Sequence, residues 1–241
     1  MAAVPIDFIE HLRAEGYHPR SNKHSNVLAE LMVRDLLSFC APMREKARQG
    51  GLVYELNQTL ITGTATWNVD LVLGDPPPGQ SVDPEDRLIA RSVPSTTQIA
   101  VEIKSVMTEH RKAIKNRKRD FEAHHDHVHR YHPRAIAGGL LVINGASTFK
   151  SPLRVDPEPT RHKEPESLVE HCVREFRAVS SRGGETGPGL EAKGILVVDF
   201  DNVDREAVRY IQRGAAPPVG DPLHYDHFLQ SICRHYEVRF G

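Results

Sequence analysis

The amino-acid sequence predicts an α/β protein in which a mixed central β-sheet of about five strands is flanked by helices. Short apolar segments rich in β-branched residues alternate with amphipathic segments whose apolar residues recur every three or four positions. The chain has 241 residues, of which 39% are hydrophobic and 26% are charged, so it can bury a full core. We expect a single domain over residues 1–241, with a core at about 25–144 and a C-terminal elaboration at 145–241.

The first half of the chain is predicted to hold a helix, a hairpin and a third strand. Leu28, Leu31 and Met32 belong to an apolar stripe at helical spacing, which indicates an amphipathic helix. Gly63 separates two strand-like segments and is expected at the hairpin turn. The expected elements are a helix at 25–40, a short basic helix at 43–49, strands at 53–62 and 64–74, a proline-rich loop at 75–96 and a strand at 98–106.

The second half is predicted to continue with helices and strands in alternation. Ile114, Phe121 and Val128 recur every seven residues, and Pro133 ends this pattern, so a long helix is expected from about 108 to 132. Such alternation after a hairpin is typical of a mixed sheet flanked by helices. The remaining expected elements are strands at 137–144 and 194–200, helices at 167–179 and 221–236, and loops at 149–165 and 180–189.

Charge and cysteine content limit the partners and the compartment. The formal net charge is −1 at pH 7, which disfavours a protein that simply coats nucleic acid but allows a local basic face. Cys40, Cys172 and Cys233 are scattered, and we expect reduced, mostly buried thiols in a cytoplasmic protein. No apolar run reaches the ~20 residues that a membrane helix needs. The N-terminus lacks a signal-peptide pattern, and no glycine loop indicates a nucleotide cofactor.

Three charged residues on neighbouring strands form the candidate catalytic site. Asp70 interrupts the apolar run V-D-L-V-L, and Glu102 and Lys104 lie two residues apart in I-A-V-E-I-K-S. Because side chains alternate along a strand, Glu102 and Lys104 point to one face, whereas Val101 and Ile103 point into the core. Two carboxylates and one ammonium are costly to bury without a shared partner. A hard divalent cation such as Mg²⁺ together with a phosphate group satisfies all three, which predicts metal-dependent phosphodiester hydrolysis.

The roles of the three side chains follow from their charges. Asp70 and Glu102 are expected to hold the metal ion, with the carbonyl of Ile103 as a further ligand. Lys104 should stay protonated beside two carboxylates, so it is expected to position the attacking water and to stabilise charge in the transition state. The alternative is an exposed strand face with a cross-strand ion pair and no ligand. The apolar residues that flank the charges favour the catalytic interpretation.

The motifs V-D, ending at Asp70, and E-I-K, at 102–104, resemble those of the PD-(D/E)XK nuclease superfamily. The restriction-endonuclease-like fold of that family has the same order of helix, three-stranded meander, helix and strand, and the resemblance covers about residues 25–144. Val69 stands where the family pattern has proline, and the segment 75–96 is inserted between the two motif halves. If this insertion disrupts the hairpin, Asp70 does not meet Glu102.

The resemblance also implies a cofactor, products and one more acidic residue. It implies a Mg²⁺-dependent endodeoxyribonuclease, with Mn²⁺ as a substitute, that leaves 5′-phosphate and 3′-hydroxyl ends. Family members often add a carboxylate from the first helix near the metal. Glu30 in L-A-E-L-M fits that role, and Asp35, about one turn further on, is its competitor.

The helix expected at 108–132 carries basic residues on one flank and histidines near its end. Phosphate contacts come from such flanks and give affinity without sequence information; the alternative is a solvated basic face. Histidines with i, i+4 spacing can hold zinc, but no partner Cys or Glu completes a pattern, so hydrogen bonds within the fold are favoured. The basic residues are Arg111, Lys112, Lys115, Lys118 and Arg119, and the histidines are His124, His125, His127, His129 and His132.

These features together predict a sequence-specific nuclease of the type II restriction class, acting on double-stranded DNA as a homodimer. The loops at 75–96, 150–165 and 180–189 are where base recognition is expected. A structure-specific repair or recombination nuclease with the same site is the first alternative. A non-catalytic DNA-binding module of this fold and a histidine-based metal sensor are the alternatives from other classes.

Overall fold

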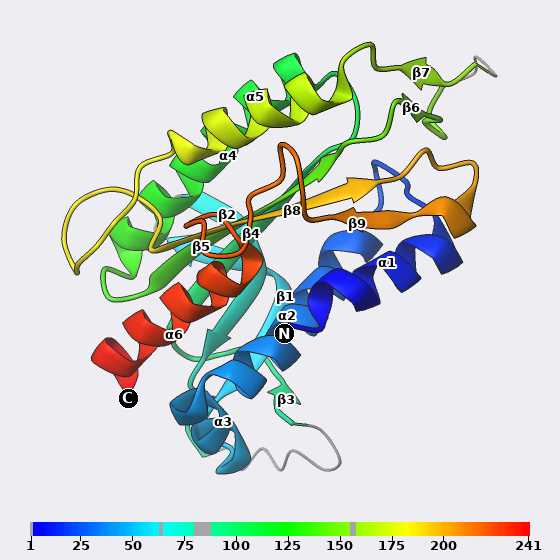
Figure 1. Cartoon of the computed structure of the whole chain (residues 1–241). Helices are drawn as coiled ribbons and strands as arrows, with labels where there is room; N and C mark the ends of the chain where they lie inside the picture. Colours follow the sequence, from blue (N-terminus) through cyan, green and yellow to red (C-terminus); the bar gives the residue numbers. More distant parts are fainter. Residues whose placement is uncertain (1, 63–64, 80–87, 155–157) are drawn as a thin grey trace.

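A computed structural model describes residues 2–62, 65–79, 88–154 and 158–241. The predicted class is confirmed: the protein is α/β, with a mixed central sheet flanked by helices (Figure 1). The predicted strand number is wrong, because within the described residues the main sheet has seven strands in the order β3-β1-β2-β4-β5-β8-β9. These strands are β1 (Val53–Thr62), β2 (Ala65–Gly74), β3 (Ala90–Arg91), β4 (Ile99–Val106), β5 (Ile136–Asn144), β8 (Ala192–Asp199) and β9 (Arg209–Ile211).

The two unpredicted strands, β3 and β9, form the edges of the sheet. They are two and three residues long and only partly buried, so they carry no apolar alternation that the sequence could reveal. A separate two-stranded sheet pairs β6 (Thr148–Phe149) with β7 (Thr160–Arg161). The helices are α1 (Val4–Glu15), α2 (Lys23–Phe39), α3 (Ala41–Arg48), α4 (His110–Tyr131), α5 (Pro165–Arg177) and α6 (Tyr225–Phe240), with a short 3₁₀ turn at Arg205–Ala207.

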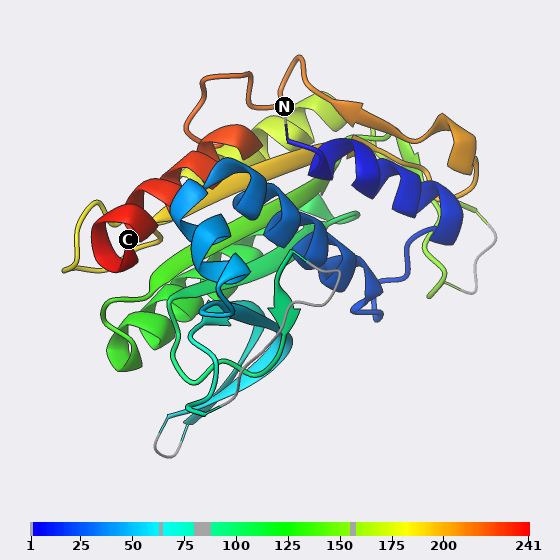
Figure 2. The same ribbon diagram turned by 90° about the horizontal axis from the view of Figure 1, so that it is seen from below.

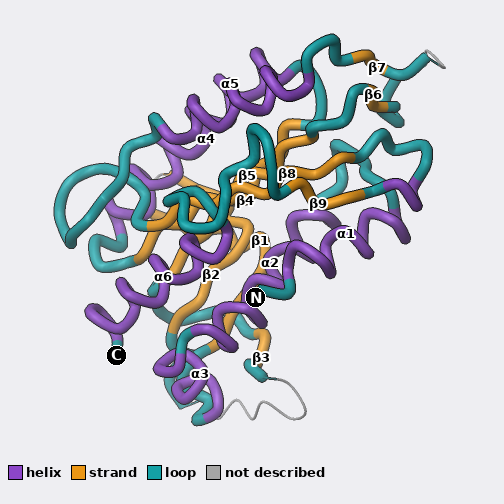
Figure 3. The backbone as a smooth tube through the Cα atoms, in the orientation of Figure 1, coloured by secondary structure: helices purple, strands orange, loops and turns teal. Residues whose placement is uncertain are grey.

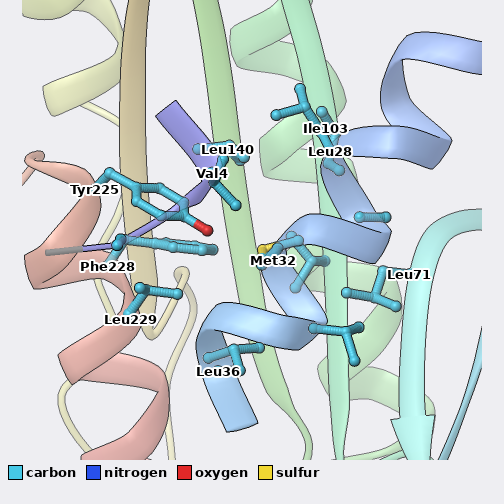
Figure 4. Packing of buried hydrophobic residues seen from close by; sticks show 14 of the residues in the cluster. Val4, Leu28, Met32, Leu36, Leu71, Ile103, Leu140, Tyr225, Phe228 and Leu229 are labelled. Atoms are coloured by element: carbon cyan, nitrogen blue, oxygen red, sulfur yellow. The ribbon is translucent and has the colours of Figure 1, made fainter. Parts of the chain in front are cut away.

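The helices cover the sheet in two layers. The helices α1, α2 and α6 pack on one face, where they lie in front of the sheet in Figure 2, and α4 and α5 pack on the other. Figure 3 shows the same arrangement with helices on both sides of the strands. In Figure 4, Leu28, Met32 and Leu36 project from α2 towards the strands, and Phe228 of α6 lies beside them. Each strand of the centre therefore buries both faces, as expected for its apolar sequence.

The central strands are connected as the sequence predicts. β1, β2 and β4 form an antiparallel meander, and α4 then crosses over to β5, which pairs with β4 in parallel. The insertion between β2 and β4 does not disrupt this register, since Ser95 N donates to Asp75 O at 2.8 Å and Asp75 N donates to Thr96 Oγ1 at 3.0 Å. The ends of the insertion are thus tied together. The turn expected at Gly63 lies outside the described residues.

The glycines of A-G-G-L lie inside β5, where side chains of the flanking helices and of the segment before β8 approach the backbone closely. A Cβ atom at Gly139 would lie 2.9 Å from Leu190 Cδ1 and 3.0 Å from Phe121 Cδ1. Such distances are below van der Waals contact, so a side chain at this position would displace its neighbours. These glycines serve the packing between sheet and helices.

One cysteine prediction is wrong. Cys40 at the end of α2 and Cys233 in α6 form a disulfide that joins residues 193 positions apart, whereas Cys172 is a free, buried thiol, as expected. The scattered spacing in the sequence hides the pairing, because α2 and α6 become neighbours only on the folded sheet. Burial raises the pKa of the Cys172 thiol to about 12. Within the part of the chain that the structure describes, no helix has the length and apolar character to cross a membrane.

Asp35 of α2 caps the first turn of α1. Its buried carboxylate accepts hydrogen bonds from the backbone N–H groups of Ala3 (2.9 Å) and Val4 (3.0 Å). Helix N-termini carry unpaired donors, and loss of their acceptor is destabilising. We expect Asp35→Ala to lower the free energy of unfolding by about 1–3 kcal/mol in urea denaturation. The matched variant Asp7→Ala removes an exposed carboxylate that lies 3.8 Å from Arg34, and it should change the free energy of unfolding by less than about 0.5 kcal/mol. Equal effects of the two substitutions would refute the capping role of Asp35.

Candidate active site at the fork between two strands

The strands β2 and β4 separate at the position of Asp70. Their pairing runs through Leu73–Ile99, Val72–Ala100 and Leu71–Val101 and is not continued towards the hairpin. Beyond this point, the Asp70 carboxylate accepts a hydrogen bond from Ile103 N at 2.7 Å. The side chain thus takes the place that a strand carbonyl would have in the ladder, and it satisfies a backbone donor that the fork would otherwise leave unpaired.

Glu102 and Lys104 lie on the face of β4 that is covered by α4. Val101 and Ile103 pack into the opposite core, which confirms the predicted alternation. Glu102 is 3% exposed, and its Oε1 forms an ion pair with the Lys104 ammonium. Its Oε2 is buried and has no hydrogen-bond partner among the described residues. The fold therefore brings Asp70, Glu102 and Lys104 to one place and leaves a carboxylate oxygen there without a donor.

Burial raises the pKa of both carboxyl groups at the fork. Burial raises the pKa of Asp70, while Lys104 and the Ile103 N–H oppose the shift. Burial, and after it repulsion from Asp70, raises the pKa of Glu102 to about 7, again against Lys104. Burial is thus the main cause of both shifts, and repulsion from a like charge adds to the shift of Glu102. A cation bound between the two carboxylates would favour the charged form of each.

Lys104 is held in its protonated form. Burial, the largest single effect, lowers its pKa, but the attraction of Glu102 and Asp70 outweighs burial, and the pKa lies above its ordinary value. An ammonium that stays charged can orient a water and stabilise a phosphate, but it cannot act as a free base near neutral pH. This agrees with the role expected from the sequence.

Helix α4 contributes a second row of residues that sequence reasoning did not assign to the site. The Nε2–H of His124 is 3.2 Å from the carbonyl of Ala100, and its Nδ1 lies 3.9 Å from Glu102 Oε2. Complete burial lowers the pKa of His124 to about 3, so the ring is neutral beside Glu102. Asp120 adds to the raised pKa of Glu102, and Arg117 donates to Ser105 O at 3.3 Å.

The signal for this row was present in the helix pattern. Arg117, Asp120 and His124 recur at intervals of three and four residues, immediately beside the buried stripe of Ile114 and Phe121. Residues in that position face the strand beneath the helix. The more numerous basic residues of the same helix instead suggested that phosphate contacts lie on the outer flank, with Arg117 only alongside them.

The expected basic flank lies on the outer side of α4. Successive residues turn about 100° around a helix, so the five side chains lie roughly 100–160° around the helix axis from Arg117. Four of them are exposed, and the fifth, Lys118, is 4.0 Å from Glu175 of α5. The structure does not bring them to the carboxylates, and a DNA contact at this flank stays a prediction. The exposed residues are Arg111, Lys112, Lys115 and Arg119.

Neither acidic residue expected from the first predicted helix joins the site. Glu30 is solvent-exposed, lies 3.8 Å from Arg91 of β3 and lines a cavity with Tyr54 and Ile89, away from Asp70. Asp35 caps α1. These contacts do not support the role expected for Glu30, because its apolar neighbours indicate a helix edge but not which strand that edge faces.

The histidines of α4 are held by the fold. His124 bonds to Ala100, Gly189 N donates to His125 Nδ1 at 3.3 Å, and His129 Nε2 lies 3.1 Å from Glu191. Among the described residues, the group of three metal-binding side chains that converge is Cys40, Cys233 and Glu237, and its cysteines form the disulfide. Within the residues that the structure describes, no three-ligand histidine site supports the zinc-sensor alternative.

Asp70 and Glu102 fit the chemistry of a hard divalent cation. They supply carboxylate oxygens, the ligands that Mg²⁺ prefers, and the orphaned Glu102 Oε2 is an acceptor that a cation would satisfy. Ile103 lines the same cavity as Asp70 and Lys104, so its carbonyl stays a candidate third ligand.

Comparisons with protein-family models, with curated proteins and with solved structures return no match to this chain.

Proposed function

We propose that the protein is a metal-dependent nuclease that hydrolyses phosphodiester bonds in DNA. The observation that carries the proposal is the convergence of Asp70, Glu102 and Lys104 at the fork between β2 and β4. The antiparallel meander, the α4 crossover and the parallel β5 have the order expected for a restriction-endonuclease-like fold, which supports the assignment. The hydrogen bond from Ile103 N accounts for an acceptor at Asp70, but the apolar packing around β4 does not account for the buried pair of Glu102 and Lys104.

The charge of each residue determines its proposed role in the reaction. Asp70 and Glu102 would hold Mg²⁺, or Mn²⁺ in its place. The bound ion would polarise the scissile phosphate and lower the pKa of water. Lys104 would hold the attacking water in line with the leaving oxygen and stabilise negative charge on the phosphate as the bond breaks. His124 lies beside Glu102 as a neutral ring and would bring no positive charge that competes with the metal ion for this carboxylate.

Sequence-specific cutting of double-stranded DNA by a homodimer is the version of this function that we favour. It rests on the resemblance to stand-alone enzymes of the type II restriction class. A structure-specific repair nuclease would use the same site without base recognition, and a non-catalytic module would bind DNA and leave it intact. The products of one assay separate these three.

The assay is cleavage of supercoiled plasmid and phage DNA by the purified protein with Mg²⁺, Mn²⁺ or EDTA. We expect nicked and linear products with either metal, none with EDTA and none from Asp70→Ala. Asp126→Ala, on the exposed side of α4, is the control and should cut like the wild type. Discrete fragments indicate restriction, and smears or a need for forks indicate repair. Intact DNA on methylated and unmethylated substrates, with binding retained, would refute the nuclease.

A further inference from the structure

A cavity of about 210 Å³ opens at the fork, beside Asp70 and Lys104. Its walls come mainly from the α1–α2 connection, the start of α2 and the end of β4, and α1, β2, β5 and α4 contribute one residue each. The volume is below the roughly 300–1,000 Å³ of pockets that hold drug-sized ligands, so it suits a compact group. Much of the wall is polar, and its polar side chains include Tyr17, Ser21, Ser25, Ser105 and Arg117.

Arg117 is fixed in the wall of this cavity with part of its guanidinium left over. Its Nε donates to Ser105 O at 3.3 Å, and its Nη1 donates to Asp120 Oδ2 at 3.0 Å. Two bonds from one planar group fix the orientation of the third nitrogen. That nitrogen, Nη2, makes no hydrogen bond within the described parts of the chain. An oriented, unused guanidinium N–H at a polar cavity is suited to an anionic oxygen.

The opposite wall is equally well ordered. Tyr17 Oη is 2.5 Å from Ser105 Oγ, and Tyr17 N donates to Asn202 Oδ1 at 2.9 Å, so the α1–α2 connection is tied to β4 and to the loop after β8. His24 lines the cavity, and burial lowers its pKa to about 4, so it adds no charge near neutral pH. Lys104 and Arg117 are therefore the cations of a cavity whose shape exists before a ligand enters.

We propose that this cavity is a phosphate subsite, in which Arg117 binds a backbone phosphate of the nucleic acid next to the phosphodiester placed at Asp70 and Lys104. The inference rests on the proposed function and assigns the substrate contact to the inner face of α4. The outer flank around Arg111 and Lys115 is separated from the carboxylates by the body of the helix. A second phosphate held here would fix the position of the strand relative to Lys104.

The test measures DNA binding without cutting. Fluorescence anisotropy of a labelled duplex in EDTA, over a series of KCl concentrations, compares the wild type with Arg117→Gln. We expect binding to weaken roughly tenfold or more and the salt slope to fall by about 0.9, the value for one lost phosphate contact. Arg130→Gln, the same substitution at an exposed position near the end of α4 that has no expected DNA contact, is the matched control and should leave both quantities nearly unchanged.

A second variant keeps Arg117 and its structural bonds in place. Ser25→Glu puts a carboxylate in the cavity at the first turn of α2, where a negative charge favours the helix. We expect it to weaken DNA binding as Arg117→Gln does. Wild-type affinity and salt slope in both variants would overturn the subsite, and so would a loss confined to Arg117→Gln, because the cavity would then not be involved.

Inorganic phosphate distinguishes a nucleic-acid subsite from a site for small phosphate compounds. Thermal stabilisation by phosphate that is lost in Arg117→Gln, together with weakened DNA binding, supports the proposal. The same stabilisation with unchanged DNA binding overturns it. The plasmid assay is read separately: a wild type that binds through Arg117 but never cuts refutes the nuclease and leaves the subsite standing. If the wild type cuts DNA and the Arg117→Gln variant binds DNA with wild-type affinity, the nuclease is supported and the phosphate subsite is refuted.

Discussion

Lys104→Ala should lower the rate of metal-dependent DNA cleavage by about 10²–10³-fold, the cost of removing one group that stabilises charge in a transition state. The expectation follows from the position of its ammonium, which pairs with Glu102, lines the cavity beside Asp70 and stays protonated. Single-turnover cleavage at saturating Mg²⁺ measures the rate of the chemical step apart from product release. Binding of duplex DNA in EDTA should change much less.

The control for this prediction is Lys112→Ala. It removes the same side chain from the same protein, but on the exposed outer side of α4. A fall of similar size in both variants would indicate a general loss of DNA affinity and would contradict a role for Lys104 in the chemical step. Circular dichroism of each variant excludes unfolding as the cause.

Cleavage should rise with pH and reach its plateau above about pH 7. Glu102 must lose its proton before it can hold a cation, and burial together with Asp70 raises its pKa to about 7. The groups that face it are Asp70 on β2, Lys104 on β4, and Asp120 and His124 on α4. Below this pH, one required deprotonation makes the cleavage rate rise about tenfold per pH unit, which forms the acid limb of the pH–rate profile. Mg²⁺ competes with the proton for Glu102, so a higher Mg²⁺ concentration should move the acid limb to lower pH.

Asp120→Asn provides the variant for the pH profile. Asp120 is one of the charges that raise the pKa of Glu102, so its neutralisation should move the acid limb to lower pH. Glu122→Gln on the same helix removes a carboxylate that does not act on Glu102 and should leave the limb in place. A profile that is flat between pH 5 and 8, or equal shifts in the two variants, would show that Glu102 does not control the rate.

The raised pKa of Glu102 also determines how the stability of the metal-free protein changes with pH. The pKa of Glu102 is higher in the folded chain than its ordinary value of 4.5. The folded state therefore binds more protons between these two values, and the stabilising contribution of Glu102 is present below about pH 4.5 and lost as the pH rises through about 7. Urea denaturation in EDTA should accordingly give less stability from this group at pH 8 than at pH 5.

The sequence by itself determined the elements that hold the site. Periodicity placed the strands around Asp70 and Glu102 and the long helix that follows them, because each buries apolar residues with its own spacing. Alternation along β4 also determined that Glu102 and Lys104 share a face. These are local consequences of backbone geometry, and they hold whatever lies next to the strand.

The neighbours of those elements were decided only by the tertiary structure. The edge strands β3 and β9 are too short to carry a pattern, and the Cys40–Cys233 disulfide depends on α2 meeting α6. The site shows the same limit: Glu30 faces β3, whereas Arg117 of α4 bonds to Ser105 and His124 lies beside Glu102. The spacing along a helix shows which residues share a side, but packing between segments distant in the sequence decides which strand that side meets.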